Sequence, residues 1–447
     1  MGNKIVIVGG GSTHTPGIVE VLKERSEDLQ LEELVLYDTD KTRNSLLGEF
    51  TKIYYRDNNS KVKVSYTTNI REAFKDANFL YVQIRPGLNI QREIDEKICL
   101  KHGVVGQETC GLGGFSFALR VIPEILKIVE VAQEICPDAW ILNYTNPEAI
   151  ISETIYKRFP KAKCLCICDM PISIEEAIAD YLKIPYKDLT FKYFGLNHFG
   201  WWTNIFDKNG QDLLPIIRER VLRGELKGLI QTNEEIIGDD YWTKTFQNVI
   251  RAFKNYPKYF PNCYLQYYYF PDEMVESDNV EYTRGSYVLN TREIAVTREI
   301  AVFEECKNVI ESGTAKNSKL LGGVHGNYIV DITNAIIYDT KERFIVNIKN
   351  NGAICNFNNE AVVEVPCYIG ATGAEPVTIG KIPTFHRSMM EMQKGYELLT
   401  VEAALTGSYN TAMEAVLLNK TIHSHKVGKQ VLDDLLEANK KYWPELK

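Results

Sequence analysis

The chain has 447 residues, of which 45% are hydrophobic and 25% are charged, and its formal net charge is −8 at pH 7. This composition is typical of a soluble globular protein with two or three domains. No long run of lysine or arginine occurs, which argues against nucleic acid or an anionic membrane as the main partner. A phosphorylated small molecule stays possible, because a few arginines can bind it locally.

We expect neither a secretory signal nor a membrane span. The sequence enters an apolar strand almost at once, without the regions that a signal peptide combines. No apolar stretch reaches about 18 residues. The ten cysteines have no regular spacing, which favours reduced thiols over a disulfide framework. We therefore predict a cytoplasmic protein.

In the first part of the chain, predicted strands alternate with helices that begin at Thr15 and cover 119–133. The strands are predicted at 4–8, 34–37, 78–84, 139–142 and 163–167. They are apolar on both faces, as in a parallel sheet that helices cover on both sides. This pattern predicts an α/β, doubly wound parallel sheet over residues 1–172.

After residue 172 the pattern changes. An extended segment is predicted at 191–199, followed by long helices at 211–227, 285–310 and 388–447 and by short strands at 344–346 and 362–365. This mixture predicts an α+β domain over residues 173–447. No flexible linker separates the two domains, so we expect a tight interface between them.

A glycine-rich turn, Gly9-Gly-Gly-Ser-Thr13, follows the first strand. Gly9 and Gly11 can form the tight turn and let backbone amides approach a pyrophosphate at the next helix N-terminus, although the third glycine of the usual fingerprint is absent. Ser12 and Thr13 add hydroxyl donors. Asp38 ends the next strand, where an acid would bind ribose hydroxyls. These features favour a Rossmann-type NAD site over NADP and over a turn without a ligand.

Polar side chains gather where the other predicted strands end. Open α/β sheets bind ligands at the carboxyl ends of their strands, so we expect these residues on one rim. They are Asp38, Arg85, Asn143, Asn146, Cys168 and Asp169.

Three cysteines alternate along the last of these strands. On a strand, Cys164, Cys166 and Cys168 share one face at about 6.6 Å spacing, too far apart for one ion bound about 2.3 Å from each sulfur. We therefore expect Cys164 and Cys166 in the core, and of the three cysteines we expect only Cys168 to be a candidate metal ligand. His198, in Gly195-Leu-Asn-His-Phe-Gly-Trp-Trp202, is a second candidate. Two protein ligands leave room for substrate oxygens around a divalent Lewis acid.

Each of these residues has a plainer interpretation. Cys168 could be structural, His198 could be a hydrogen-bonded core histidine, and Asp169 could cap the helix that follows it.

A series of short motifs decides between these readings by resemblance. In order they are Gly9–Thr13, Val105-Gly-Gln-Glu-Thr-Cys-Gly111, Asn143-Tyr-Thr-Asn-Pro147, Cys168-Asp-Met-Pro171, Asn197-His-Phe-Gly-Trp-Trp202, Pro261-Asn-Cys-Tyr-Leu-Gln-Tyr-Tyr268, Glu364-Val-Pro-Cys367 and Leu399-Thr-Val-Glu402. Together they strongly resemble glycoside hydrolase family 4 over nearly the whole chain, and most of all its 6-phospho-α-glucosidases. Members with Cys-Asp-Met-Pro are typically α-enzymes, whereas β-enzymes usually have Asn in place of the Asp.

The resemblance implies a lactate/malate-dehydrogenase-like fold, with NAD and Mn²⁺ or another divalent metal as cofactors. The long helices and aromatic patches are compatible with a homo-oligomer, either a dimer or a tetramer. The resemblance assigns Cys168 and His198 to the metal, Asp169 to proton donation, Tyr264 to proton acceptance, and Arg92, Asn146 and Arg284 to the substrate. Without the resemblance, Tyr264 could belong to a core tyrosine cluster, and Arg92 and Arg284 could form surface ion pairs.

The implied reaction is hydrolysis of 6-phospho-α-glucosides such as maltose 6'-phosphate to glucose 6-phosphate and an aglycone sugar. It proceeds by NAD-dependent oxidation at C3, elimination, water addition and re-reduction, without net oxidation. Three alternatives stay open: a 6-phospho-β-glucosidase of the same family, a net NAD-dependent dehydrogenase, and a non-catalytic NAD sensor.

Overall fold

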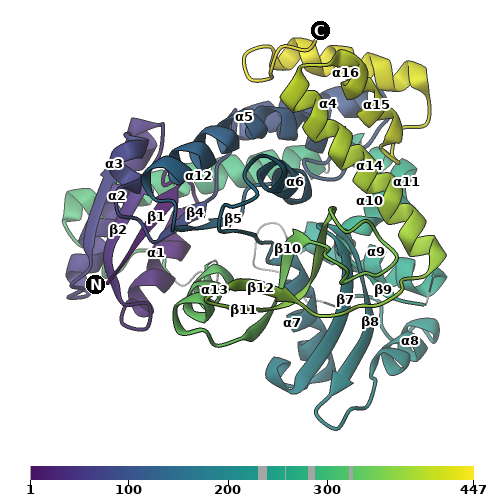
Figure 1. Ribbon diagram of the computed structural model, residues 1–447, viewed down its shortest axis with the longest axis horizontal. Helices are drawn as coiled ribbons and strands as arrows, with labels where there is room; N and C mark the ends of the chain where they lie inside the picture. The colour runs from purple at the N-terminus through teal and green to yellow at the C-terminus, as the bar shows by residue number, and fades with distance from the viewer. Residues whose placement is uncertain (1, 230–238, 257, 280–286, 322–325) are drawn as a thin grey trace.

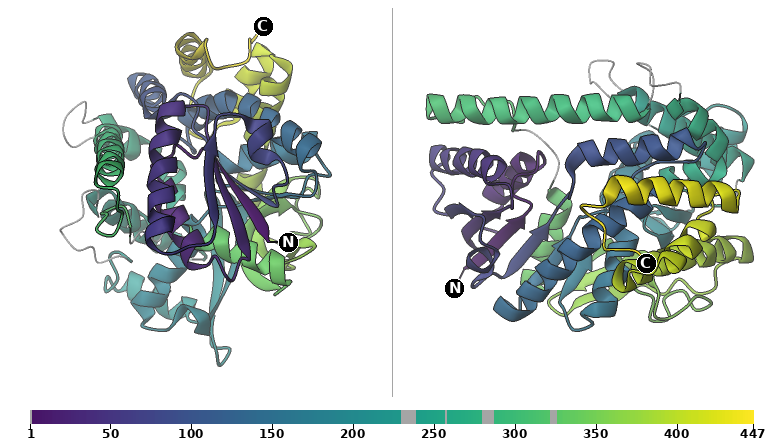
Figure 2. Two further views of the ribbon diagram at one scale, coloured as in Figure 1. Left: turned by 90° about the vertical axis from the view of Figure 1, so that its left-hand side faces the viewer. Right: turned by 90° about the horizontal axis from the view of Figure 1, so that it is seen from above.

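The computed structural model describes residues 2–229, 239–256, 258–279, 287–321 and 326–447, and one continuous sheet of twelve strands runs through this part of the chain. Helices lie on both sides of the sheet in two perpendicular views (Figures 1 and 2). The strand order is β3-β2-β1-β4-β5-β6-β10-β11-β7-β8-β9, and β12 pairs with β11.

The N-terminal elements alternate as the sequence predicts. They are β1 (Asn3–Val8), α1 (Thr15–Glu24), β2 (Leu31–Tyr37), α2 (Lys41–Asp57), β3 (Lys63–Thr67), α3 (Ile70–Phe74), β4 (Phe79–Val82), α4 (Leu88–Lys101), α5 (Leu112–Ile135), β5 (Trp140–Asn143), α6 (Glu148–Arg158) and β6 (Cys164–Cys166). Their six strands are parallel, in the order 3-2-1-4-5-6 of a Rossmann fold.

Strand β1 shows why these strands read as continuous apolar runs. Ile5 and Ile7 pack into one hydrophobic core with helices α1 and α2. Val6 and Val8 point the other way, into a second core with α3, α5 and α6. Because alternate residues of a strand face opposite sides, burial of both faces needs apolar residues at every position.

The remaining elements form the second part of the fold. They are α7 (Met170–Leu182), β7 (Leu189–Leu196), β8 (Phe199–Asp207), α8 (Leu214–Leu222), α9 (Asp239–Asn255), β9 (Phe260–Pro261), α10 (Gln266–Tyr269), α11 (Pro271–Asn279), α12 (Tyr287–Ser312), α13 (Asn327–Tyr338), β10 (Glu342–Lys349), β11 (Val362–Gly370), β12 (Gly373–Pro376), α14 (Thr384–Thr406), α15 (Tyr409–Leu418) and α16 (His425–Asn439). Two single-turn 3₁₀ helices cover Tyr186–Asp188 and Cys263–Leu265.

A single row of residues joins the parallel and antiparallel parts of the sheet. Asn347 on β10 pairs with Cys166 on β6 and with Glu364 on β11, and Glu364 pairs in turn with Gly195 on β7. The pairs β6–β10 and β11–β7 are each registered at this one position. Cys168 and Asp169 follow β6 by two and three residues, and His198 follows β7 by two, so this row positions these three candidates.

The structure differs from the prediction at three places. The edge strand β3 was not predicted, because its residues are half-buried or exposed and give a weak apolar signal. The helix predicted at 388–447 is wrong, since α14 ends at Gly407 (φ 68°) and two shorter helices follow. The extended segment predicted at 191–199 is a hairpin that turns at Asn197 and His198.

The predicted domain boundary at residue 172 would fall inside α7, and the sheet continues across it. The division into two domains therefore remains a proposal, taken up below.

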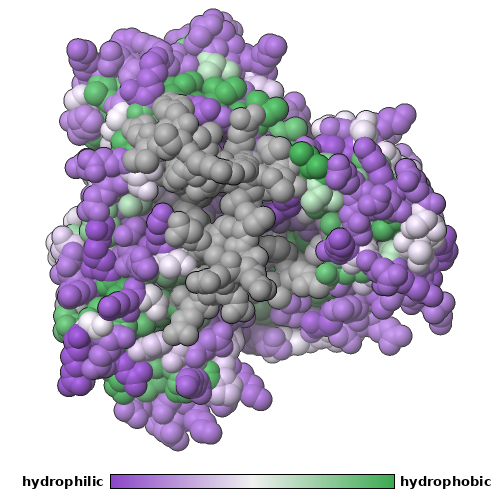
Figure 3. Space-filling view, turned by 180° about the vertical axis from the view of Figure 1, so that it is seen from behind, coloured by the Kyte–Doolittle hydropathy of each residue, from purple (hydrophilic) through white to green (hydrophobic). Residues whose placement is uncertain are grey.

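No helix within the described residues is long and apolar enough to cross a membrane. Hydrophilic side chains cover most of the outer parts of the face in Figure 3, where residues are described. All ten cysteines are described and free, and Cys355 is the one that is exposed.

Helix α14 is tied to α6 and β11 by a buried ion cluster. Lys394 on α14 donates to Glu153 on α6 at 2.8 Å and pairs with Glu397. Glu153 also accepts the backbone N–H of Val362 on β11. Burial alone would lower the pKa of Lys394, but the two carboxylates hold it above its ordinary value.

We predict that Lys394→Met lowers the free energy of unfolding by about 3–5 kcal/mol, because it leaves two buried carboxylates without their cation. Lys429→Met is the matched control, since that lysine is more than half exposed in its pair with Asp433 and should matter little. Chemical denaturation measures both variants. Equal losses would contradict the structural role of the cluster.

Candidate active site

The glycine-rich loop after β1 is built for close approach. Gly9 has a φ of 95°, and a Cβ there would lie 2.5 Å from the carbonyl oxygen of Gln83. A Cβ on Gly11 would lie 2.8 Å from Asp38 Oδ2. Ser12 Oγ accepts the backbone N–H of His14 just before α1, and Ser12 and Thr13 are half-buried. Glycine at both positions thus allows the loop to pack against β4 and Asp38 at the N-terminus of α1, where an anionic ligand group would be stabilised.

Asp38 lies against this loop, as the sequence predicts. Its Oδ2 accepts the N–H of Gly11 at 2.8 Å, and its Oδ1 accepts the N–H of Asp40 at 2.9 Å. The nearby cation, Arg43, donates to the Gly11 carbonyl at 3.1 Å and to Glu299 at 2.7 Å. The cation beside the acid is therefore already paired with a carboxylate.

Cys168 and His198 come together, although 30 residues separate them. Cys168 Sγ lies 3.4 Å from His198 Nε2, and both side chains are buried. Burial, and next the neighbouring Asp169, raise the pKa of the Cys168 thiol well above its ordinary value. Burial lowers the pKa of His198 to about 3, so its imidazole is neutral at pH 7.

Cys164 and Cys166 lie closer together than the predicted strand spacing of about 6.6 Å. The Sγ atoms of Cys164 and Cys166 lie 3.8 Å apart, closer than the backbone spacing suggests, because their side chains lean together. Both are nevertheless buried in the hydrophobic core, as predicted.

Hydrogen bonds to the buried Glu364 hold the turn that carries His198. His198 has a φ of 60°, a conformation rarely adopted by residues other than glycine. Its neighbour Asn197 donates to Glu364 Oε1 at 2.8 Å, and Tyr193 donates to Glu364 Oε2 at 2.6 Å. Burial raises the pKa of Glu364 to about 7. Glu364 belongs to the row that joins the two parts of the sheet, so the turn and the sheet are fixed together.

Tyr264 lies directly over His198. Their ring centroids are 3.9 Å apart, with an angle of 22° between the planes. Asn262 accepts the backbone N–H of Tyr264 and starts the short 3₁₀ helix that carries it. The predicted proton acceptor and the predicted metal ligand are therefore in contact.

Asp169 is exposed, in contrast to Cys168 beside it. It occupies the N-cap position of α7, but its side chain makes no capping hydrogen bond there. The plainer interpretation, an aspartate whose side chain caps the helix, therefore does not apply.

Arg92 belongs to a charge cluster rather than to a surface pair. Its Nε donates to Glu96 at 2.7 Å and its Nη1 lies 3.0 Å from Glu108. Arg85, from the end of β4, also pairs with Glu108. Burial alone would raise the pKa of Glu108, but the two guanidinium groups outweigh it and hold the pKa at about 2.

The structure treats the two remaining substrate candidates differently. Asn146 is half-buried after β5, and its Oδ1 accepts the N–H of Glu148 at 3.4 Å. Arg284 lies outside the described residues.

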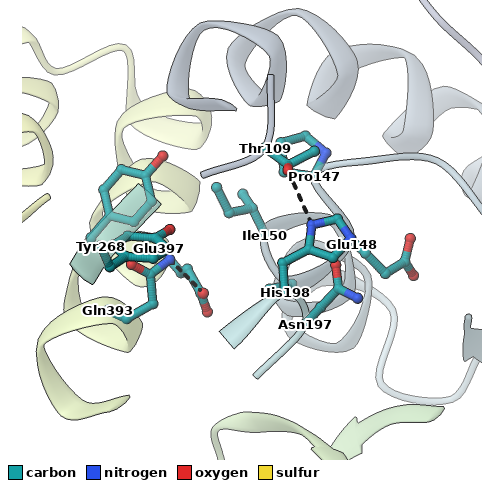
Figure 4. A pocket seen from close by; sticks show the side chains of 11 residues that line it. Thr109, Pro147, Glu148, Ile150, Asn197, His198, Tyr268, Gln393 and Glu397 are labelled. Carbon is teal, nitrogen blue, oxygen red and sulfur yellow. Dashed lines mark hydrogen bonds between the residues drawn. The ribbon is translucent and has the colours of Figure 1, made fainter. Parts of the chain in front are cut away.

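A small pocket lies beside His198 (Figure 4). In Figure 4, Thr109, Pro147, Glu148, Asn197 and His198 line one side, and Tyr268, Gln393 and Glu397 line the other. Thr109 bonds to Nδ1 of His198, whereas Cys168 faces Nε2 and does not line the pocket. The pocket is therefore behind the predicted metal position and is not the reaction space.

Two polar residues near the site were given no role by the sequence. Glu108 and Thr109 stand in the Val105–Gly111 motif, yet only the folded chain shows that they contact Arg92 and His198. In the sequence, the only sign of a role for these two residues was the polar run Gln107-Glu108-Thr109, which lies between two glycines.

The residues fit a divalent ion. A sulfur at about 2.3 Å and a nitrogen at about 2.1 Å from one metal can be 3.4 Å apart, as Cys168 and His198 are. Within the described ranges no group of three His, Cys, Asp or Glu side chains converges. The glycine loop between β1 and the N-terminus of α1, with Asp38 beside it, fits a dinucleotide.

Comparisons with known proteins agree with this geometry. A 6-phospho-alpha-glucosidase of Leptotrichia buccalis is 45% identical, over 99% of both chains. The 6-phospho-beta-glucosidase of Thermotoga maritima is 30% identical, over 98% of this chain and 99% of its own. The crystal structure of a 6-phospho-alpha-glucosidase from gut microorganisms, in complex with NAD and Mn²⁺, has a TM-score of 0.92 and 36% identity and covers 100% of both chains.

The fold also resembles that of malate dehydrogenase from Plasmodium falciparum, with a TM-score of 0.51 and 14% identity over 90% of this chain and 99% of that one. This likeness confirms the dehydrogenase-like fold. The model of the family 4 glycosyl hydrolases matches residues 4–184, and the model of their C-terminal domain matches residues 193–422. The chain therefore belongs to glycosyl hydrolase family 4.

Proposed function

We propose that the protein is a 6-phospho-α-glucosidase that depends on NAD and a divalent metal. It hydrolyses 6-phospho-α-glucosides such as maltose 6'-phosphate to glucose 6-phosphate and an aglycone sugar. The proposal is carried by one combination of findings. The chain is 45% identical to a 6-phospho-alpha-glucosidase over 99% of both chains, and Cys168 and His198 are in contact. The α-relative is 45% identical and the β-relative 30%, which supports the α assignment.

The glycine loop and Asp38 would bind NAD. The dinucleotide's phosphates would lie at the N-terminus of α1, beside the hydroxyls of Ser12 and Thr13, and Asp38 would accept from the ribose. The 2'-phosphate of NADP would be repelled by the Asp38 carboxylate. The adjacent cation, Arg43, already forms an ion pair with Glu299. This arrangement supports NAD.

Cys168 and His198 would hold Mn²⁺ or a similar ion. When bound, NAD⁺ supplies reversible hydride transfer at C3 of the sugar, and the ion supplies Lewis-acid polarisation next to it. Tyr264, stacked on His198, would remove the C2 proton. Asp169, whose exposed carboxylate caps no helix, would protonate the departing glycosidic oxygen.

Arg92, Asn146 and Arg284 would bind the phosphorylated sugar. For Arg92, support comes from its place in the charge cluster with Glu108, whose neighbour Thr109 bonds to His198. We also propose a Rossmann NAD domain at 1–172, a domain for substrate, metal and oligomerisation at 173–447, a cytoplasmic location and a homo-oligomer. The two family models, which match residues 4–184 and 193–422, support the division into domains, and the free cysteines support the cytoplasmic location.

We predict that the enzyme, with NAD⁺, Mn²⁺ and a thiol reductant, cleaves a chromogenic 6-phospho-α-glucoside and not its β-anomer. The assay follows release of the chromophore from each anomer. NADH absorbance should stay constant during turnover, because the cofactor is regenerated. Cleavage of only the β-anomer would overturn the α assignment, and NADH formation in proportion to product would indicate a dehydrogenase instead.

Asp169→Asn should slow substrates with poor leaving groups by about 10²–10⁴-fold, because general acid catalysis is lost. An activated aryl phosphoglucoside, whose leaving group needs little protonation, should lose much less activity. The ratio of kcat/KM values for maltose 6'-phosphate and the aryl substrate measures this difference. A uniform loss on both substrates would argue against a proton-donating role.

Chelation should abolish activity, and added Mn²⁺ should restore it. Cys168→Ser should weaken the response to Mn²⁺, because it removes the thiolate ligand. Cys355→Ser is the matched control, since Cys355 is exposed and makes no contact with the site. Activity titrations with Mn²⁺ compare the three proteins. Full activity after chelation would remove Cys168 and His198 from the mechanism.

A further inference from the structure

The side-chain amide of Gln107 has an orientation that the backbone determines. Its Oε1 accepts the N–H of Thr109 at 2.7 Å and the N–H of Cys110 at 2.8 Å. A backbone N–H can only donate, so the atom that receives both bonds is the amide oxygen and not the nitrogen. Gln107 is buried, which keeps water from competing for this position.

The Thr109 hydroxyl lies 2.8 Å from the same Gln107 oxygen. That oxygen has no proton, so Thr109 must donate its own. Cys110 Sγ, at 3.6 Å, is the other possible acceptor, but sulfur accepts weakly and the contact is longer. Thr109 Oγ1 therefore has only lone pairs left for its remaining partner, His198 Nδ1 at 3.1 Å.

An acceptor at that distance requires a proton on Nδ1 of His198. The opposite nitrogen, Nε2, then carries the lone pair, and it is this nitrogen that lies 3.4 Å from Cys168 Sγ. The stacked ring of Tyr264 fixes the plane of the imidazole, and Thr109 determines which of its edges faces Cys168.

We propose that Thr109, aligned by Gln107, is a positioning residue that fixes His198 as the Nδ1–H tautomer and keeps Nε2 free to bind a divalent ion. This inference rests on the proposed function, in which His198 is a metal ligand. Metal-binding histidines depend in this way on a partner for their second nitrogen. The pocket in Figure 4 borders the Thr109–His198 contact, which is drawn there as a dashed line.

Thr109→Val and Thr109→Ser separate the hydroxyl from the shape of the side chain. In NAD-free protein, Thr109→Val should bind Mn²⁺ about 10–100-fold more weakly than wild type, and Thr109→Ser should restore the affinity. Thr51→Val is the matched control, because it removes a buried threonine hydroxyl that bonds only to Leu47 O within α2. Calorimetric titration with Mn²⁺ gives the four dissociation constants. Equal affinity of Thr109→Val and wild type would overturn the proposal.

The tautomer itself is measurable without metal. ¹⁵N NMR of the metal-free protein, with the His198 signals assigned by their loss in His198→Asn, should show Nδ1 protonated and Nε2 unprotonated. Thr109→Val should lose this preference and Thr109→Ser should keep it, and an Nε2–H tautomer in wild type would contradict the proposal even if the valine variant does not fold. Failure of wild type to bind Mn²⁺ would instead refute the metal site, because the tautomer is read independently.

Discussion

The contact between Cys168 Sγ and His198 Nε2 is the constraint on which the site depends. Three strand steps separate β6 from β7 in the sheet, which in a flat sheet would be roughly 14 Å. The two segments converge because the row Cys166–Asn347–Glu364–Gly195 holds β6, β10, β11 and β7 together at one register, while each outer junction is a single pair. Beyond that row, the segments that follow β6 and β7 can bend toward each other and bring Cys168 next to His198.

The row also supports the site chemically. Glu364 has one carboxylate oxygen on Asn197 and the other on Tyr193, so the buried acid that joins the strands also fixes the turn that presents His198. Glycine is needed at position 200 because a Cβ there would lie 2.1 Å from the Tyr193 hydroxyl. Tyr264 then covers the imidazole, and Glu108 with its two arginines places a compact charge cluster nearby.

Sequence patterns predicted the parallel half of this fold well, because β1, β4 and β5 are buried on both faces and read as apolar runs. They failed where local sequence is ambiguous. The half-exposed β3 lacked an apolar signal, and one long C-terminal helix was predicted where Gly407 ends α14. The row that joins the sheet was also invisible, since single-residue pairs between distant strands leave no periodic trace.

The site residues show the same division. Cys168, His198 and Tyr264 were identified through resemblance, and their contacts are present in the fold, whereas Glu108 and Thr109 act through partners far away in sequence. The most direct test of the account is anomalous diffraction at the manganese edge from crystals grown with NAD⁺ and Mn²⁺. The account predicts one peak about 2.0–2.5 Å from both Cys168 Sγ and His198 Nε2. A well-occupied manganese peak that touches neither atom would contradict it.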